Sequence, residues 1–361
     1  MLTQEQIAGL IEKSETAGAK PIAAKPTNTI PPRKPKSEKL SELISKYVEE
    51  HMVQGKWKEK THQEVTSALD LAVSILGDVP AKTIDRSVMV DYLGKLKRLP
   101  VNMRKSGKPV KKVLEQENKR TISQRTINKY ITRISSLFIW CVRQGYLDRN
   151  PAEGLSIATN VKEHEERKAY TRDEVRKVVS LAVKHKNVAP ERYFVPLIAA
   201  YSGARLNEIC QLHIEDVKQI DGVWCFDIND EGDKRLKHKS SSRMIPVHPA
   251  LIDAGLLDHV ERMRAAGEPR VWMLLEHKRD GYSHLFGKWY QRFNRKEITK
   301  DTKKVLHSFR HTVADTLKQA GVAEGVIAEI LGHANQSITT GRYGKRYKPA
   351  MLLDALMKLE Y

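Results

Sequence analysis

Residues 306–312 read LHSFRHT, a stretch that predicts a helix with two different faces. His307 and Arg310 are three residues apart, so their side chains share one face of that helix. Leu306 and Phe309 fall on other positions, and we expect them to point into a hydrophobic core. A His-x-x-Arg spacing is common by chance, and alone it indicates only a helix start with two polar residues.

A tyrosine follows this helix in the segment ILGHANQSITTGRYGK, residues 330–345. The predicted helix before it ends at Gly332 and presents His333. Tyr343 lies further on, among small residues and between two nearby glycines that allow the tyrosine to move. The ordinary interpretation of such a tyrosine is a half-buried loop residue.

An arginine precedes the same helix in the segment YSGARLNEICQLHIEDV, residues 201–217. Arg205 lies between a glycine-containing turn and a predicted helix start. A guanidinium placed there can bind two phosphate oxygens at once, although a lone arginine is more often an ordinary surface residue. Glu208, one turn later, either orients Arg205 or faces solvent.

Basic residues also gather in the segment KRLKHKSSSRMIP, residues 234–246. The alternating stretches WCFDIND and RMIPVH flank it, and they predict a two- or three-stranded antiparallel sheet. A lysine on such a hairpin can reach into a DNA groove and protonate a leaving hydroxyl. Lys237 is the first candidate, Lys239 competes with it, and Lys234 is less favoured. The alternative is a solvated sheet edge.

Apart from this sheet, the apolar spacing predicts helices throughout. Thr61-His-Gln-Glu64 and Thr171-Arg-Asp-Glu174 have the pattern of capping boxes that begin helices. The predicted helices begin near residues 37, 61, 87, 123 and 171, and further ones cover 191–202, 205–212, 283–294, 307–320, 323–331 and about 349–359.

The composition along the chain divides it into two domains. Residues 1–36 have the Ala, Pro and Lys content of a flexible segment, and residues 37–155 form a small all-helical domain. The charged stretch 156–168 is predicted to be a linker, and residues 169–361 form the second domain.

The net charge indicates the class of partner. Lys and Arg number 63 against 44 Asp and Glu, which gives a formal net charge of +19 over 361 residues. A field of this sign attracts polyanions, most commonly nucleic acid, whereas the alternative is a solvated basic surface.

Other classes of protein find little support in the sequence. No apolar run is long enough for a membrane helix, and the N-terminus lacks a signal-peptide pattern, so we expect a cytoplasmic protein. Cys141, Cys210 and Cys225 are expected to be buried thiols, because their spacing fits no metal site. We therefore expect neither a metal nor a nucleotide cofactor.

The ordered set of Arg, Lys, His-x-x-Arg, Gly-His and Tyr resembles the tyrosine recombinase family, the phage integrases and their relatives. SGARLNEI resembles the family's TGxRxxEl segment, LHSFRHT its HxLRHT segment, and LGHANQSITTGRY its LGHsxxxTTxxY segment. GYLDRNPA resembles the exit of the family's core-binding domain, so the resemblance covers about residues 37–361. The chain departs from the pattern in two respects: the spacing from His333 to Tyr343 is one residue longer than in many members, and the hairpin lysine is ambiguous.

The resemblance implies a fold that is mainly α with a small antiparallel sheet. A helical core DNA-binding domain would precede a mixed α/β catalytic domain of the tyrosine recombinase type. It also implies a site-specific recombinase, most simply an integrase of a prophage or genomic island. The implied roles are a nucleophile that forms a 3′-phosphotyrosine (Tyr343), clamps on the phosphate oxygens (Arg205 and Arg310), a general acid (Lys237) and assisting histidines (His307 and His333). His311 fits the family's habit of a second histidine after this arginine.

The implied partners are double-stranded DNA and a homotetramer on synapsed sites, with accessory DNA-bending proteins as further candidates. The C-terminal segment carries Leu352, Leu353, Leu356 and Leu359 on one face. The pattern alone fits packing within the chain nearly as well, but the resemblance implies that this face packs against a neighbouring protomer. A resolution-type or transposon-borne recombinase uses the same residues. A relaxing topoisomerase and a catalytically silent DNA-binding protein are the remaining alternatives. Residues 1–36 look too short for the arm-binding domain of many integrases.

Overall fold

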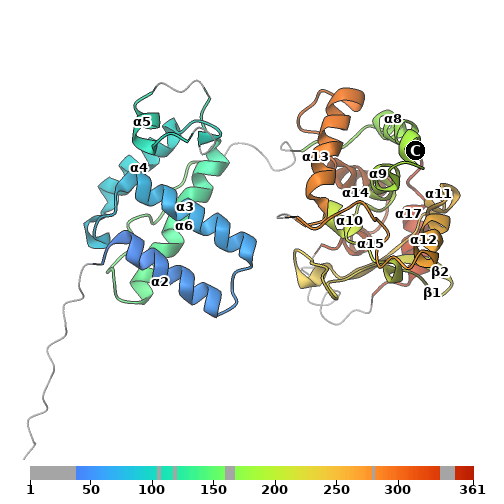
Figure 1. Cartoon of the computed structure of the whole chain (residues 1–361), viewed down its shortest axis with the longest axis horizontal. Helices are drawn as coiled ribbons and strands as arrows, with labels where there is room; N and C mark the ends of the chain where they lie inside the picture. The colour runs from blue at the N-terminus through green and yellow to red at the C-terminus, as the bar shows by residue number, and fades with distance from the viewer. Residues whose placement is uncertain (1–37, 104–106, 117–119, 159–166, 279–280, 334–345) are drawn as a thin grey trace, which may run out of the picture. The chain divides into compact units, whose positions relative to one another are not determined.

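The structure, a computed structural model, describes most of the chain. The predicted N-terminal segment 1–36 and the candidate nucleophile Tyr343 lie outside the described residues. The chain divides between Ser156 and Ile157 into two compact units, and the short segment Trp57–Gln63 is grouped with the second. The described stretches are residues 38–103, 107–116, 120–158, 167–278, 281–333 and 346–361 (Figure 1).

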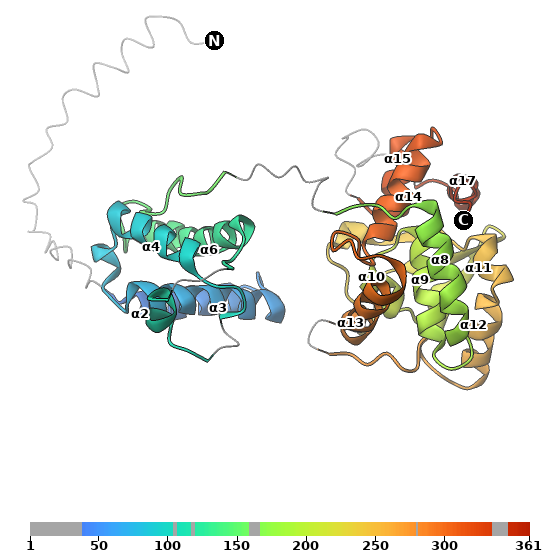
Figure 2. The same cartoon turned by 90° about the horizontal axis from the view of Figure 1, so that it is seen from above.

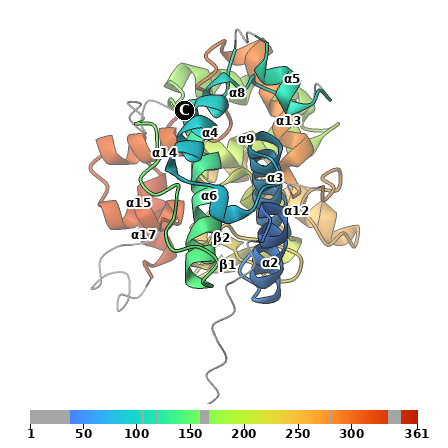
Figure 3. The ribbon, with the colours of Figure 1, turned by 90° about the vertical axis from the view of Figure 1, so that its left-hand side faces the viewer.

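The first unit contains α-helices and no strand among its described residues. The helix α6 lies against both α2 and α4 (Figure 1 and Figure 3). Large side chains such as Leu69, Tyr92 and Phe138 are fully buried between the helices, which explains the apolar periodicity of the sequence. The helices are α2 (Leu40–Val53), α3 (Glu59–Leu76), α4 (Arg86–Arg98), α5 (Val110–Leu114) and α6 (Gln124–Arg143).

Helix starts in this unit follow the sequence signals except at α3 and at α5, a short helix that was not predicted. The helix α6 begins beside Ser123, as predicted, and Ser123 caps it by accepting a hydrogen bond from the backbone N–H of Thr126. The predicted capping box at Thr61 is wrong, because α3 already begins at Glu59. The backbone N–H of His62 donates to the carbonyl of Lys58, so Thr61 lies inside the first turn rather than before it.

The second unit surrounds a single buried helix, α9. Side chains from Tyr193 to Ser202 on α9 are buried on every side, because α8, α10, α11 and α14 all contact it (Figure 2). The helices α11 and α12 were not predicted from the sequence. The helices are α8 (Arg172–Ala182), α9 (Pro190–Ser202), α10 (Leu206–Cys210), α11 (Pro249–Asp253), α12 (Leu256–Ala265), α13 (Ser283–Phe293), α14 (Ser308–Gln319), α15 (Glu324–Leu331) and α17 (Pro349–Leu356).

A small antiparallel sheet carries the basic hairpin. Its strands are β1 (Val217–Ile220), β2 (Val223–Ile228) and β3 (Arg243–Pro246), in the order β1-β2-β3. Phe226 in the middle strand is paired with Val217 on one side and with Ile245 on the other. The chain between β2 and β3 is the segment in which the sequence places the candidate lysines.

The C-terminal helix corrects one prediction. We expected the leucine face of α17 to pack against a neighbouring protomer. Leu352, Leu356 and Leu359 are instead at most 1% exposed, and α17 packs against β2, β3 and α15 of its own chain. These leucines belong to the core of the second unit, because they fill the space beside the sheet. Burial within the chain therefore explains the apolar pattern.

The predicted fold class is confirmed: the chain is mainly α with a small antiparallel sheet. None of the described helices has both the length and the apolar character needed to cross a membrane.

Candidate active site

The His-x-x-Arg pair lies at the start of α14. His307 is the residue before the helix, and Arg310 lies in its first turn. Leu306 and Phe309 are buried in the core, as the periodicity predicts. Arg310 is buried too, with 5% of its surface exposed, which the sequence did not reveal. A buried guanidinium requires partners for its five N–H groups.

Only part of that requirement is met. Nη1 of Arg310 donates to the carbonyl of Gly203 at 3.1 Å. Nη2 is buried and has no hydrogen-bond partner among the described residues. Burial, and then the positive charges of Arg205 and Arg243, lower the pKa of Arg310 to about 9, which still leaves it charged at neutral pH. Such a group is suited to bind an anionic oxygen.

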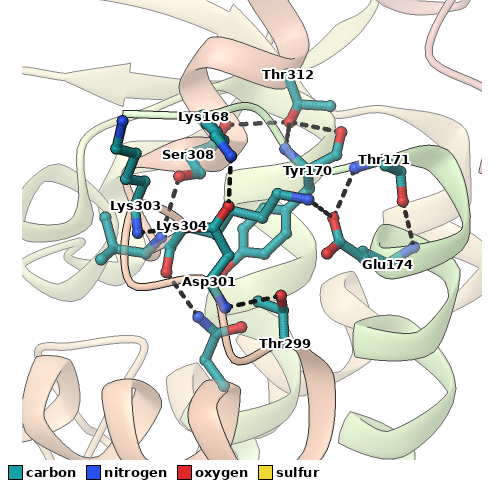
Figure 4. Close-up of polar contacts among 12 residues, drawn as sticks. Lys168, Tyr170, Thr171, Glu174, Thr299, Asp301, Lys303, Lys304, Ser308 and Thr312 are labelled. Carbon is teal, nitrogen blue, oxygen red and sulfur yellow. Dashed lines mark hydrogen bonds and ion pairs between the residues drawn. The ribbon is translucent and has the colours of Figure 1, made fainter. Parts of the chain in front are cut away.

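Polar contacts hold the start of α14 in place on the side shown in Figure 4. The backbone N–H of Tyr170 donates to Oγ1 of Thr312 at 2.8 Å, and Thr312 donates in turn to a backbone carbonyl. Lys168 and Asp301 form an ion pair with 2.9 Å between Nζ and Oδ2. Lys304 pairs with Glu174 at the predicted capping box of α8, which the structure confirms. These contacts fix the position from which His307 and Arg310 project.

Arg205 reaches the same place from a different element. It is the N-cap of α10 and follows a turn in which Gly203 has φ of +64°. A Cβ on Gly203 would lie 2.5 Å from Cδ2 of Leu331, so only glycine fits there. Nη2 of Arg205 donates to the carbonyl of Gly332 at 3.3 Å. The turns before α10 and after α15 are thereby joined.

The three segments therefore meet at one point. Arg310 binds the carbonyl of Gly203, Arg205 binds the carbonyl of Gly332, and His333 is the next residue in the chain. Partial burial first, and then the charges of Arg310 and Arg205, lower the pKa of His333. The structure brings together four of the six predicted site residues: Arg205, His307, Arg310 and His333.

The hairpin lysines differ in their surroundings. Lys234 is buried in an ion pair with Asp216, which removes it from the candidates for the general acid. Lys237 is exposed and lines the same hollow as Arg205 and Asn207. The side chain of Lys239 lies outside the described residues, so the choice between these two lysines stays a prediction.

The site has more positive than negative charge. Glu208 is a buried carboxylate that accepts hydrogen bonds from Nη1 of Arg205 at 2.8 Å and from Nη2 of Arg243 at 2.9 Å. Burial acts to raise the pKa of Glu208, but the two guanidiniums outweigh that effect and the pKa is lowered. One carboxylate thus faces the guanidiniums of Arg205, Arg243 and Arg310. A phosphodiester would supply the missing negative charge.

Arg243 is the residue that the sequence analysis missed. It stands in RMIPVH, which we interpreted only as a strand. Its side chain is 2% exposed, because the two-residue period of a strand places it on the same face as Ile245, which is fully buried. An arginine placed within an otherwise apolar strand could have been recognised as a buried ion-pair partner.

The two tyrosines near the end of the chain can be compared only in part. Tyr343 lies outside the described residues. Tyr347 is half-buried, and its backbone N–H donates to Oε2 of Glu329 at 3.3 Å. Its hydroxyl lies so close to Gly325 that a Cβ there would be 2.9 Å away. Tyr347 is therefore packed against α15.

His307 should titrate well below an ordinary histidine. Desolvation and the charges of His311, Arg310 and Arg205 lower its pKa to about 4 although part of the ring is exposed. The unfolded chain therefore binds more protons between about pH 4 and the ordinary pKa of 6.5, and we expect the free energy of unfolding to rise with pH in that window. NMR titration of the imidazole, assigned with His307→Gln, measures this directly.

Phosphate should reverse the effect. An anion beside the ring favours imidazolium, so adding inorganic phosphate or site DNA should raise the His307 pKa. A midpoint near 6.5 that phosphate does not move would contradict this picture of the site.

A model of the Phage integrase family matches residues 168–348. "Tyrosine recombinase" of Thermosipho africanus is 25% identical over 219 residues, which covers 60% of this chain and 70% of that protein. "Tyrosine recombinase XerC-like" of Caldanaerobacter subterraneus is 26% identical over 254 residues, and covers 61% of this chain and 62% of that protein. "Tyrosine recombinase XerA" of Pyrococcus horikoshii is 30% identical over 199 residues, which covers 53% of this chain and 64% of that protein.

Solved structures share the fold. A lambda integrase dimer bound to a COC′ core site aligns with a TM-score of 0.59 and 17% identity, over 95% of this chain and 87% of that chain. The Tn1549 transposon integrase in complex with transposon right end DNA aligns with a TM-score of 0.55 and 18% identity. That alignment covers 89% of this chain and 98% of that chain. A lambda integrase tetramer bound to a Holliday junction aligns with a TM-score of 0.58 and 16% identity. That alignment covers 92% of this chain and 87% of that chain.

Proposed function

The chain belongs to the phage integrase family of tyrosine recombinases, enzymes that cleave and rejoin DNA, and we propose that it is a site-specific DNA recombinase with Tyr343 as its nucleophile. The observation that carries this proposal is the buried Nη2 of Arg310, which has no partner among the described residues. It lies where Arg205 and two histidines also converge, so a phosphate oxygen is the ligand that best suits it.

The residues divide the reaction among them. The phenolate oxygen of Tyr343 attacks the scissile phosphorus, a 3′-phosphotyrosine bond forms, and the bond to the 5′ oxygen breaks. Arg205 and Arg310 bind the two non-bridging oxygens, whose charge increases in the transition state. Lys237 gives its proton to the departing 5′ oxygen, with Lys239 as its competitor. The phosphotyrosine keeps the energy of the broken linkage, so a 5′-hydroxyl can rejoin the strand without ATP.

Histidines support this exchange of protons. His307 and His333 stand beside the arginines and have lowered pKa values, so both are neutral in the free protein at pH 7. A neutral imidazole can accept a proton from the phenol and can also donate a hydrogen bond to phosphate. We assign them these assisting roles.

Tyr343 is preferred to Tyr347 for two reasons. The sequence places Gly341 and Gly344 around Tyr343, and the number of residues between His333 and Tyr343 is close to the family pattern. Tyr347 is already engaged with Glu329 and Gly325 on α15. Using Tyr347 as the nucleophile would require breaking those contacts.

The rest of the chain is proposed to hold duplex DNA. Residues 37–155 would be the core-binding domain, 156–168 the linker and 169–361 the catalytic domain. Lys111, Lys112 and Arg143 are exposed on α5 and α6 of the first unit, where they can contact phosphates. Because such contacts release counterions, affinity should fall steeply with salt. Assembly as a homotetramer on two synapsed sites is part of the same proposal, and accessory DNA-bending proteins are candidate helpers.

The activity we propose is that of an integrase of a prophage or genomic island, with a resolution-type or transposon-borne recombinase as the alternative. Relatives are named XerC-like and XerA, whereas the solved neighbours are integrases. A plasmid that carries the DNA flanking the gene separates the two. Formation of a circular excision product supports an integrase, and conversion of plasmid dimers to monomers supports resolution.

Cleavage should persist in EDTA. The guanidiniums already supply the positive charge that a divalent cation gives in other phosphoryl-transfer sites, so chelation should leave the rate unchanged within about twofold. The measurement uses a nicked duplex of the recombination site, from which the cleaved strand cannot be rejoined, and counts protein covalently bound to DNA on a denaturing gel. Loss of the adduct in EDTA, with recovery in magnesium, would overturn the mechanism.

A further inference from the structure

Arg243 makes an unusual set of contacts for a residue in a strand. It begins β3 and is 2% exposed. Nε donates to the carbonyl of Ile330 at 2.8 Å, Nη1 to the carbonyl of Ser241 at 2.8 Å, and Nη2 to Oε2 of Glu208 at 2.9 Å. Each nitrogen thus binds a different segment. A lysine cannot reproduce this, because only guanidinium holds its donors in a fixed planar fork.

Those three segments each lead to a residue of the proposed active site. Glu208 is on α10, whose N-cap is Arg205. Ile330 is in the last turn of α15, three residues before His333. Ser241 is in the hairpin that carries Lys237 and, in addition to its carbonyl contact, its hydroxyl accepts a hydrogen bond from Arg205 at 3.3 Å. Arg243 therefore lies behind the catalytic residues and links the elements that carry them.

Gly332 shows how closely the guanidinium packs against the turn that precedes His333. Gly332 has φ of +67°, and a Cβ on it would lie 2.8 Å from Nη1 and 2.9 Å from Cζ of Arg243. The turn that presents His333 therefore passes directly over the guanidinium. The absence of a side chain at this turn is required by Arg243 as well as by the backbone conformation.

We propose that Arg243 is a positioning residue for the recombinase reaction, acting through Glu208 on Arg205 and through the end of α15 on His333. All three nitrogens of its guanidinium already donate to protein oxygens, so Arg243, unlike Arg310, has no unpartnered nitrogen to offer a DNA phosphate. The carboxylate of Glu208 lies between two guanidiniums: Oε1 accepts from Arg205 and Oε2 accepts from Arg243. The position of Arg205 therefore depends on how Arg243 holds Oε2. The inference rests on the proposed function, because it concerns that same site.

The test compares Arg243→Lys with the unaltered full chain. Lysine keeps the charge but cannot bind Ile330, Ser241 and Glu208 together, so Arg205 and His333 lose their support. We expect single-turnover cleavage of the nicked duplex to fall by about 10²-fold, the size of effect that a misplaced catalytic group produces. Affinity for the same duplex, measured by fluorescence anisotropy, should stay within about threefold, because many other basic residues hold the backbone.

A second substrate shows whether the loss acts through Arg205. A methylphosphonate at the scissile position replaces one charged non-bridging oxygen with a methyl group. Its transition state carries less negative charge and therefore depends less on stabilisation by the arginines. The defect of Arg243→Lys should shrink to less than about tenfold on this substrate. An equal loss on both substrates would show general damage and overturn the proposal, as would unchanged cleavage on the ordinary duplex.

Two controls separate folding from positioning. Arg270→Lys alters another partly buried arginine, which binds the carbonyl of Gln211 and Asp233, and it should cleave normally. If Arg243→Lys fails to fold, Gly332→Ala carries the test, because its Cβ displaces the same guanidinium; normal cleavage by that folded variant would overturn the proposal. Absence of any covalent adduct with the unaltered chain would instead contradict the proposed function itself.

Discussion

Tyr343→Phe is expected to bind the recombination site with normal affinity and to form no covalent adduct with DNA. Phenylalanine keeps the shape of the ring but has no oxygen to attack phosphorus. Removing the nucleophile of an enzyme that forms a covalent intermediate costs several orders of magnitude in rate, and here it removes the intermediate altogether. The nicked duplex traps the adduct, and a denaturing gel followed by peptide mapping identifies the modified residue.

Tyr347→Phe is the matched control, because the two tyrosines lie four residues apart in GRYGKRYK. It should still trap the adduct. The phenol of Tyr347 lies against Gly325, and its backbone is held by Glu329, so it contributes packing on α15. Trapping by Tyr343→Phe, together with its loss in Tyr347→Phe, would exchange the two roles and leave the class of enzyme unchanged.

Nearby cations make Tyr343 a reasonable nucleophile in chemical terms. A phenol has an ordinary pKa of about 10, so attack at neutral pH requires help in losing the proton. Arg342 and Lys345 are its neighbours in the sequence, and their charges favour the phenolate. A plot of adduct formation against pH should therefore rise below the ordinary pKa of tyrosine.

Local sequence signals predicted much of the fold because they act over a few residues. Ser123 and Thr171 cap helices as their patterns indicate, and the spacing around Leu43 and Phe309 matches their burial. The short helices α11 and α12 were missed, since helices of 5 and 10 residues leave little room for a periodic pattern. The role of α17 was also misjudged, because an apolar face shows that a helix is buried and does not show which chain buries it.

The candidate site could be proposed from the sequence as a set of residues but not as a geometry. Arg205 and Arg310 are far apart in the sequence, and they meet because tight turns at Gly203 and Gly332 bring three elements together. The glycines of these turns can be recognised in the sequence. The hydrogen bonds that their carbonyls accept from Arg310 and Arg205 cannot. Arg243 was missed for the same reason, since its importance lies in two long-range contacts, with Ile330 and with Glu208.

Arg310 illustrates a conflict between stability and function. The guanidinium is buried, and its Nη2 has no hydrogen-bond partner among the described residues. Two other arginines lie near enough to lower its pKa. A buried charge without a full set of partners costs free energy in the folded protein. The same features prepare it to bind a phosphate oxygen without prior rearrangement. We therefore expect the free enzyme to be less stable than it would be with a neutral side chain at this position.

Arg310→Met should therefore separate the two effects. Cleavage of the nicked duplex should fall by about 10² to 10³-fold, because one clamp on the transition-state charge is worth roughly 3 to 4 kcal/mol. Arg310→Ala and Arg205→Ala should lose cleavage in the same range, while affinity for the site changes little. The unfolding midpoint of Arg310→Met without DNA should not decrease, since methionine fills a similar volume and removes the repulsion from Arg205 and Arg243.

The outcome depends on which of two energies is larger. The lost hydrogen bond to the carbonyl of Gly203 costs about 1 kcal/mol, whereas relief of a buried, incompletely paired charge is worth about 1 to 4 kcal/mol. Denaturant unfolding of the full chain measures the difference in the free energy of unfolding between Arg310→Met and the unaltered chain. Arg310→Lys serves as a comparison that keeps a positive charge on a flexible side chain at the same position. A marked loss of stability in Arg310→Met would mean that Nη2 has a partner in the free protein. Near-normal cleavage by the same variant would remove Arg310 from the active site.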